Sequence, residues 1–215
     1  MFRRDYLLRQ IEEFVALLAR LAGLKRTGQW GDASSMAGSQ FKALAGADIG
    51  ELLQMSDTEL IARLAEGDAV VGMREKISMA ARLFLEQGDI YRGQGKIEES
   101  HACYLKGLHL LLNVMANEPA AARRDYLPPL ETFLIGLHDS TLTLETNAML
   151  MRHYEQLGEY AKAEDSLFRM LDAEPDNVEL LDFGIGFYQR VMRLKDEPLE
   201  LGNLPRAEVT AGLAE

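Results

Sequence analysis

The sequence predicts an all-α fold assembled from helical hairpins, and three observations support this prediction. First, two stretches share a pattern in which a Tyr is followed at fixed offsets by a turn Gly, a large residue and a small residue. The matched pairs are Tyr91 and Tyr154, Gly95 and Gly158, Ile97 and Tyr160, and Ser100 and Ala163. Second, Tyr188 follows Tyr154 by 34 residues, and Tyr154 follows Tyr91 by 63, which is 34 plus an insert of 29. Third, apolar residues of the N-terminal segment recur every three or four positions.

The N-terminal segment, Asp5 to Gly23, is predicted to be one amphipathic helix. Its apolar residues follow one another at spacings of four, four, three and three, which places them on one face: Leu7, Ile11, Val15, Leu18 and Leu21. Charged residues lie largely elsewhere on the helix. Because their signs are mixed, we expect the apolar face to pack on neighbouring helices rather than on a membrane surface.

Further hairpins and inserts follow along the chain. In a degenerate repeat, Gly28, Trp30 and Ala33 keep the offsets of the turn Gly, the large residue and the small residue. Ser56 to Glu59 is a capping-box sequence that should open a short helix. The predicted segments are a degenerate repeat (14–47), a helical insert (48–70), a clear repeat (81–114), a helical insert (115–143), a clear repeat (144–177), a capping helix (178–195) and a C-terminal tail (196–215).

Local signals place several helix ends. The first helix of the repeat at 81–114 should begin early, near Val71. Pro128 and Pro129 fit the start of a helix in the second insert. In the tail, Pro198 and Gly202 predict non-helical structure, with a short helix from Pro205 to Leu213.

The two clear repeats resemble the tetratricopeptide repeat (TPR), a helical hairpin with a period of 34 residues. The resemblance covers both clear repeats well, the capping helix partly and the degenerate repeat weakly. It implies a single domain, 1–215, in which hairpins stack into a short right-handed α-solenoid with Tyr91, Tyr154 and Tyr188 buried in their hairpins. The start of the chain, Phe2 to Glu12, also resembles an uncharacterised bacterial family of TPR-like proteins, which implies no function.

In TPR proteins the first helices line a concave groove that binds a peptide or a helix, so the resemblance implies a protein-binding surface. The polar groove candidates are Arg82, Asp89, Arg92, Arg152, Glu155, Gln156, Gln189 and Arg190. Arg82, Arg92 and Arg152 would form a basic patch for an acidic peptide, because arginine pairs with a carboxylate through two parallel hydrogen bonds. Leu85 and Asp89 stand where a TPR subgroup that clamps C-terminal carboxylates has Lys and Asn, which argues against such a clamp here.

Composition and charge argue against several classes of partner. The chain of 215 residues has a net charge of −11, with −8 in residues 154–215 and +3 in residues 1–26. This acidity disfavours nucleic acid as a partner. Cys103 is the only cysteine, so the chain forms no intramolecular disulfide, which favours a cytoplasmic location. Since no apolar run approaches about 18 residues, we expect no membrane-spanning helix.

Residue types used in catalysis and metal binding are present at spacings that suit neither. His138, Asp139 and Ser140 are adjacent, so they cannot form the relay of a catalytic triad. His101 and Cys103 are two residues apart and point to different sides of a helix, so they cannot share a metal ion. We therefore expect no catalytic residue, no metal and no cofactor.

The function expected from the sequence is that of a non-catalytic protein–protein interaction module, with homo-oligomerisation left open. Two alternatives remain. A sensor would bind a small molecule or short peptide between the two clear repeats, and a large pocket with convergent polar groups would favour it. An enzyme of unrecognised type would be favoured by a cluster of titratable groups with strongly shifted pKa values.

Overall fold

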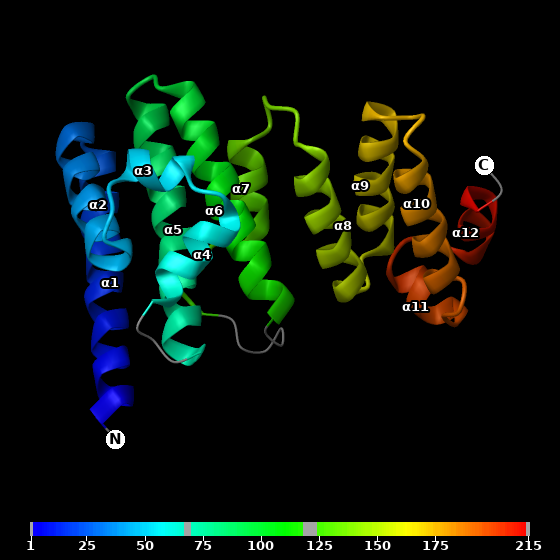
Figure 1. Cartoon of the computed structure of the whole chain (residues 1–215), viewed down its shortest axis with the longest axis horizontal. Coiled ribbons are helices and arrows are strands. Elements are labelled where there is room, and N and C mark those ends of the chain that lie inside the picture. The colour runs from blue at the N-terminus through cyan, green and yellow to red at the C-terminus, as the bar shows by residue number, and fades with distance from the viewer. Residues whose placement is uncertain (1, 67–69, 118–123, 214–215) are drawn as a thin grey trace. The chain divides into compact units, whose positions relative to one another are not determined.

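Helices are the regular structure of the described part of the chain, residues 2–66, 70–117 and 124–213 of the computed structural model (Figure 1). No β-strand occurs in these residues, which confirms the predicted all-α class. The chain separates into two compact units, residues 1–141 and 142–215, where the sequence predicts one domain. None of the described helices combines the length and the apolar content needed to span a lipid bilayer.

The larger unit is organised around a hairpin of two long helices, α5 and α6. Its described helices are α1 (Phe2–Arg26), α2 (Trp30–Ala45), α3 (Ile49–Gln54), α4 (Asp57–Ala65), α5 (Val70–Gly93), α6 (Ile97–Asn117) and α7 (Leu130–Gly136). Helices α1, α2 and α4 lie against α5, and α7 lies against α6. Phe41 of α2, Phe84 of α5 and Phe133 of α7 are fully buried, so the centre of the core lies on this hairpin.

Glycines bring α5, α6 and α7 close together. A Cβ atom at Gly107 would lie 2.5 Å from the Phe133 ring and 3.0 Å from the carbonyl oxygen of Ala81. A Cβ atom at Gly88 or at Gly136 would lie 2.5 Å or 2.8 Å from the ring of Tyr104. The ring of Tyr104 therefore occupies the space that these two glycines leave, beside α5 and α7.

The predicted capping box at the start of α4 is present. The Ser56 hydroxyl accepts a hydrogen bond from the Glu59 amide at 3.2 Å, and the Glu59 carboxylate accepts one from the Ser56 amide at 2.8 Å. The short helix α3 before it was not predicted. Asp48 caps α3 by accepting a hydrogen bond from the Glu51 amide at 3.0 Å. Both caps satisfy an amide that has no partner within its helix.

The helix α1 buries most of the predicted face in full or in part: Leu21 is buried, and Leu7, Ile11 and Leu18 are half-buried. Phe14 and Leu21 are fully buried, and the Phe14 ring meets the edge of Tyr126 with ring centroids 5.5 Å apart. Val15, by contrast, is exposed, so the prediction that it is buried was wrong. The helix therefore also packs through Phe14, which lies next to the predicted face and contacts Tyr126.

The smaller unit begins with the second predicted hairpin. Its described helices are α8 (Leu144–Leu157), α9 (Tyr160–Ala173), α10 (Val178–Val191), α11 (Asp196–Leu201) and α12 (Arg206–Gly212). Gly158 closes α8 with φ of 76°, and Gly95 has φ of 77° between α5 and α6. Both turns therefore use the left-handed conformation that glycine adopts without a Cβ clash.

The C-terminal region differs from the prediction in one helix. Residues 196–201 form α11, although a non-helical tail was predicted there. Pro198 lies in the first turn of α11, where its missing N–H removes no hydrogen bond of the helix. Helix α12 follows Pro205, as predicted.

Two of the three repeat tyrosines are buried as predicted. Tyr154 and Tyr188 are buried in the smaller unit, and Tyr188 donates a hydrogen bond to Glu164 of α9 at 2.7 Å. Tyr91 is only half-buried, so its predicted burial was wrong. The buried tyrosine of the α5–α6 hairpin is Tyr104 instead.

Candidate functional site

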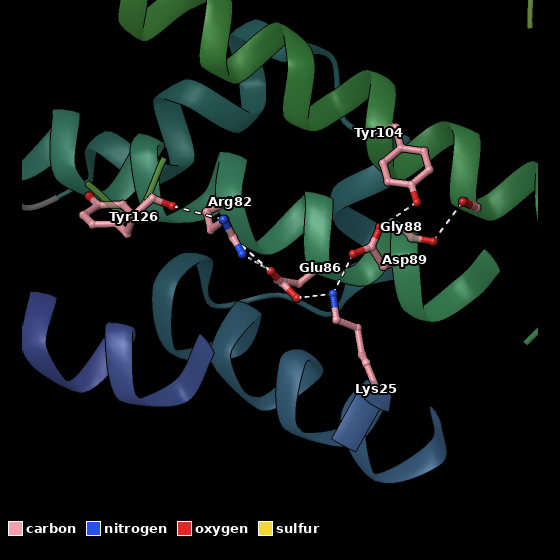
Figure 2. A network of polar contacts seen from close by, with 8 residues as sticks. Lys25, Arg82, Glu86, Gly88, Asp89, Tyr104 and Tyr126 are labelled. Atoms are coloured by element: carbon pink, nitrogen blue, oxygen red, sulfur yellow. Dashed lines mark hydrogen bonds and ion pairs between the residues drawn. The ribbon is translucent and has the colours of Figure 1, made fainter. Parts of the chain in front are cut away.

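One side of α5 carries a row of charged residues. Arg82, Glu86 and Asp89 are spaced by four and three residues, which brings them to one side of the helix. Figure 2 shows them with Lys25 of α1 and Tyr104 of α6. These five residues are here termed the α5 polar network. Arg82 and Asp89 are predicted groove residues, whereas Lys25, Glu86 and Tyr104 were missed by the sequence reasoning.

Lys25 connects the last turn of α1 to α5. Its Nζ lies 2.6 Å from a carboxylate oxygen of Glu86 and 2.6 Å from one of Asp89. Burial lowers the pKa of Lys25, but the two carboxylates outweigh burial and raise the pKa above its ordinary value. The ammonium group therefore stays charged and links the first helices of two successive hairpins.

Glu86 is almost completely withdrawn from solvent, with 3% of its side chain exposed. Arg82 donates to its Oε1 from Nη2 at 2.5 Å and from Nε at 2.9 Å. The other oxygen, Oε2, has the ion pair with Lys25 as its partner rather than an aligned hydrogen bond. Both oxygens thus face cations, which is the condition under which a buried charge is tolerated.

Asp89 and Arg92 are held by contacts with α6 and α7. The Tyr104 hydroxyl donates a hydrogen bond to Asp89 at 2.8 Å. Burial, and after it the charge of Asp89, raises the pKa of Tyr104, so the phenol stays protonated. The Arg92 guanidinium lies 5.4 Å from the centroid of the Tyr104 ring and donates to the carbonyl oxygen of Gly136 at 2.5 Å. The Ser100 hydroxyl donates a hydrogen bond to the carbonyl oxygen of Gly88 at 2.8 Å.

The row continues towards the segment before α7. Arg82 donates a long hydrogen bond, 3.4 Å, to the carbonyl oxygen of Tyr126. The Tyr126 hydroxyl and the Arg124 guanidinium each donate to Glu75 of α5 at 2.6 Å. The charges along this side of α5 are therefore paired within the unit.

In the smaller unit an ion pair joins α8 to α10. Arg190 donates to Glu155 from Nε at 2.7 Å and from Nη2 at 2.9 Å, through two parallel hydrogen bonds. Hydrogen bonding to Glu155 raises the pKa of Arg190. The pair links successive first helices, as Lys25 does in the larger unit.

The other predicted groove residues of this unit, Arg152, Gln156 and Gln189, are exposed on α8 and α10. Their side chains have no partner in the described part of the chain. Arg82 and Arg92 belong to the other unit and are held by internal contacts. The basic patch of Arg82, Arg92 and Arg152 therefore stays a prediction.

A second charged cluster joins the first insert to α6, and the sequence did not indicate it. Asp57 Oδ2 lies 2.5 Å from His109 Nδ1, and Asp57 Oδ1 accepts a hydrogen bond from Lys106 at 2.9 Å. Lys106 also donates to the carbonyl oxygen of Met55 at 2.7 Å. Since Asp57 is the first residue of α4, the cluster holds the start of α4 on α6.

Asp57→Asn is expected to destabilise the protein near neutral pH and to have a smaller effect in acid. Burial raises the pKa of Asp57, but hydrogen bonds from His109 and Lys106 outweigh it and lower the pKa from 3.8 to about 2. Such a carboxyl stabilises the fold above its unfolded pKa, and this contribution is lost as the pH falls through the folded pKa. Urea unfolding of both proteins at several pH values should show the difference shrinking from pH 4 to pH 2. A constant difference would contradict this assignment.

Three further features of the described residues bear on metal binding, ligand binding and nucleophilic catalysis. The described residues contain no group of three or more His, Cys, Asp or Glu side chains placed to hold a metal ion. A shallow pocket of about 420 Å³ is lined by Leu17, Asp32, Ser35, Met36, Ser39 and Gln40, from α1 and α2. Cys103 is fully buried, and burial followed by Glu99 raises the pKa of its thiol to about 12, so it is not an activated nucleophile.

Comparison with known proteins identifies a family without an assigned activity. A family model described as "Family of unknown function (DUF6483)" matches residues 1–215. No curated protein and no solved structure matches the chain.

Proposed function

We propose a function for the chain as a member of the family of unknown function DUF6483, to which it belongs by the match over residues 1–215. It acts as a cytoplasmic, non-catalytic protein–protein interaction module of TPR type. Within each unit the hairpins stack as in a right-handed α-solenoid, and the first helices present the binding surface.

The observation that carries the proposal is the pairing of successive first helices. Lys25 of α1 lies between Glu86 and Asp89 of α5, and Arg190 of α10 pairs with Glu155 of α8. A module that binds through its first helices needs these helices side by side, with their remaining polar groups on a shared surface. Cross-helix ion pairs supply that alignment in both units.

The smaller unit is the proposed binding surface. In the larger unit the charges of the α5 polar network are already paired, so a ligand would have to displace those partners. Arg152, Gln156 and Gln189 are exposed and have no partner in the described part of the chain. An acidic peptide segment suits this surface, because the guanidinium of Arg152 is free to pair with a carboxylate.

Arg152→Glu is expected to reduce partner capture about tenfold or more, because it replaces attraction to an acidic segment with repulsion. The intact chain is immobilised, proteins are captured from a lysate of the native organism, and mass spectrometry quantifies those retained over a blank support. Circular dichroism should show unchanged helix content, since Arg152 is exposed and has no hydrogen bond or ion pair with a described residue.

The matched control is Arg169→Glu. Arg169 is also an exposed arginine of the smaller unit, but it lies on the second helix, α9. Equal capture by both variants would rule out the first-helix surface as the binding site. Arg92→Glu is a poor test, because it would remove the hydrogen bond to Gly136 and disturb the fold.

A further inference from the structure

Helix α10 contains a glycine that packing within the unit does not explain. Gly186 lies in the interior of the helix and is half-buried. Apart from its chain neighbours and the local helix backbone, the only described heavy atom within 4 Å of a Cβ placed there is Arg190 Nη1, at 3.4 Å. Gly184 differs, because a Cβ there would lie 3.2 Å from the Leu167 side chain. Glycine is less favourable than alanine inside a helix, so Gly186 leaves open space at a cost in stability.

The nitrogen atom beside this space is a hydrogen-bond donor that is held in place and not used. Glu155 of α8 accepts from Nε and Nη2 of Arg190, so Nη1 lies on the other side of the guanidinium and has no acceptor among the described residues. An oxygen atom that enters the space over Gly186 comes within reach of Nη1, because N–H···O bonds span about 2.7–3.2 Å. Since Glu155 already balances the charge of Arg190, a neutral carbonyl oxygen suits Nη1.

Arg152 lies at the same level of the neighbouring first helix. Helices α8 and α10 run in the same direction (Figure 1), and the ion pair of Glu155 with Arg190 joins them. Arg152 precedes Glu155 by three residues and Gly186 precedes Arg190 by four. Both therefore lie about one helical turn before the ion pair, and the space over Gly186 faces the same surface as Arg152.

The charges around this space set the orientation of a ligand. Arg152 is exposed and has no partner in the described part of the chain, so it can pair with a carboxylate. Asp182 is exposed one turn before Gly186 on α10, where it repels a carboxylate. An acidic group is therefore directed towards α8, and an uncharged part of the same ligand lies over α10.

We propose that the smaller unit binds an extended acidic segment whose main chain crosses α10 over Gly186. A carbonyl oxygen of the segment accepts a hydrogen bond from Arg190 Nη1, and an acidic side chain pairs with Arg152. A helical segment is unsuitable, because its carbonyl oxygens are bonded within the helix. Glycine permits the approach, because it has no Cβ that would hold a second main chain away. This inference rests on the proposed function and adds the conformation of the partner and the residue that selects it.

The test uses the intact chain and a pool of random heptapeptides with a central glutamate and blocked ends. The peptide that the wild type enriches most is labelled, and fluorescence anisotropy measures its affinity for each variant. Gly186→Ala is expected to weaken binding about tenfold, because the added methyl group separates the main chain of the peptide from Nη1. Gly186→Leu should abolish binding. Gly186→Ala should also raise the urea midpoint of unfolding, since alanine favours the helix, so the lost affinity does not come from unfolding.

Gly38→Ala on α2 is the matched control. Gly38 also lies inside a helix, and a Cβ there would have no described heavy atom within 4 Å beyond its chain neighbours and the local helix backbone. This variant should raise the urea midpoint of its own unit and bind the peptide like the wild type.

Two results would overturn the inference. One is a Gly186→Leu variant that binds the peptide as tightly as the wild type, and the other is a wild type that enriches no peptide from the pool. Neither result bears on the proposed function, which fails instead if Arg152→Glu retains proteins from the lysate like the wild type.

Discussion

Tyr104→Ala is expected to lower the free energy of unfolding of the larger unit by about 3–5 kcal/mol, as other deletions of buried aromatic side chains do. The ring is buried on α6 and fills the space beside Gly88 and Gly136. Without the ring, a cavity opens between α5, α6 and α7. These helices cannot move together to close it, because α5 packs on α6 and α6 packs on α7 through other contacts. The Asp89 carboxylate also loses a hydrogen-bond donor.

Urea unfolding followed by tryptophan fluorescence measures this effect. Trp30 is the only tryptophan and lies on α2, beside Gly93 of α5, so its fluorescence reports on the larger unit. Tyr104→Phe is the matched control. It removes only the hydroxyl and should cost about 1 kcal/mol, because Asp89 keeps its ion pair with Lys25. Equal losses for the two variants would show that the ring itself contributes little packing.

Features of the fold that depend on neighbouring residues could be predicted from the sequence. The capping box at Ser56, the left-handed turn at Gly158 and the helix after Pro205 each rest on contacts within a few residues. Such signals act in the same way whatever surrounds them. The α3 cap at Asp48 is of the same kind, because Asp48 accepts a hydrogen bond from the amide of Glu51, three residues away.

Features that depend on distant residues could not be predicted. The apolar pattern of α1 has a broad hydrophobic side, and the choice of Phe14 over Val15 depends on Tyr126, more than 100 residues away. Spacing also cannot tell that Tyr104 rather than Tyr91 fills the α5–α6 hairpin. The division of the chain after residue 141 is likewise decided by packing between helices rather than by local composition.

The candidate site was predicted in part. Their positions in the repeat predicted Arg82 and Asp89 as groove residues. These positions gave no sign that Arg82 is paired with Glu86 and that Asp89 is hydrogen-bonded by Tyr104 inside the unit. Glu86 did carry a signal in the sequence, because it stands among Leu83, Phe84, Leu85 and Ile90, where a carboxylate needs a cation. That cation is Lys25, which lies 61 residues away in the sequence, so the local pattern could not identify it.

Glu86→Leu is expected to destabilise the larger unit by about 3–5 kcal/mol, as the removal of one member of a buried ion pair commonly does. Leucine has a similar volume, so the effect is electrostatic rather than a cavity. Arg82 loses its carboxylate and keeps only the long hydrogen bond to Tyr126, and Lys25 keeps only Asp89. Trp30 fluorescence in urea again provides the measurement.

Two further variants separate this explanation from a general intolerance of leucine. Glu131→Leu changes an exposed glutamate of α7 in the same unit and should alter stability by less than about 0.5 kcal/mol. The triple variant Lys25→Met, Arg82→Met and Glu86→Leu removes all three charges together and should recover most of the lost stability, because no buried charge is left unpaired. If the triple variant is as unstable as Glu86→Leu alone, the unpaired cations are not the cause, and Glu86 acts through its shape at the contact between α1 and α5.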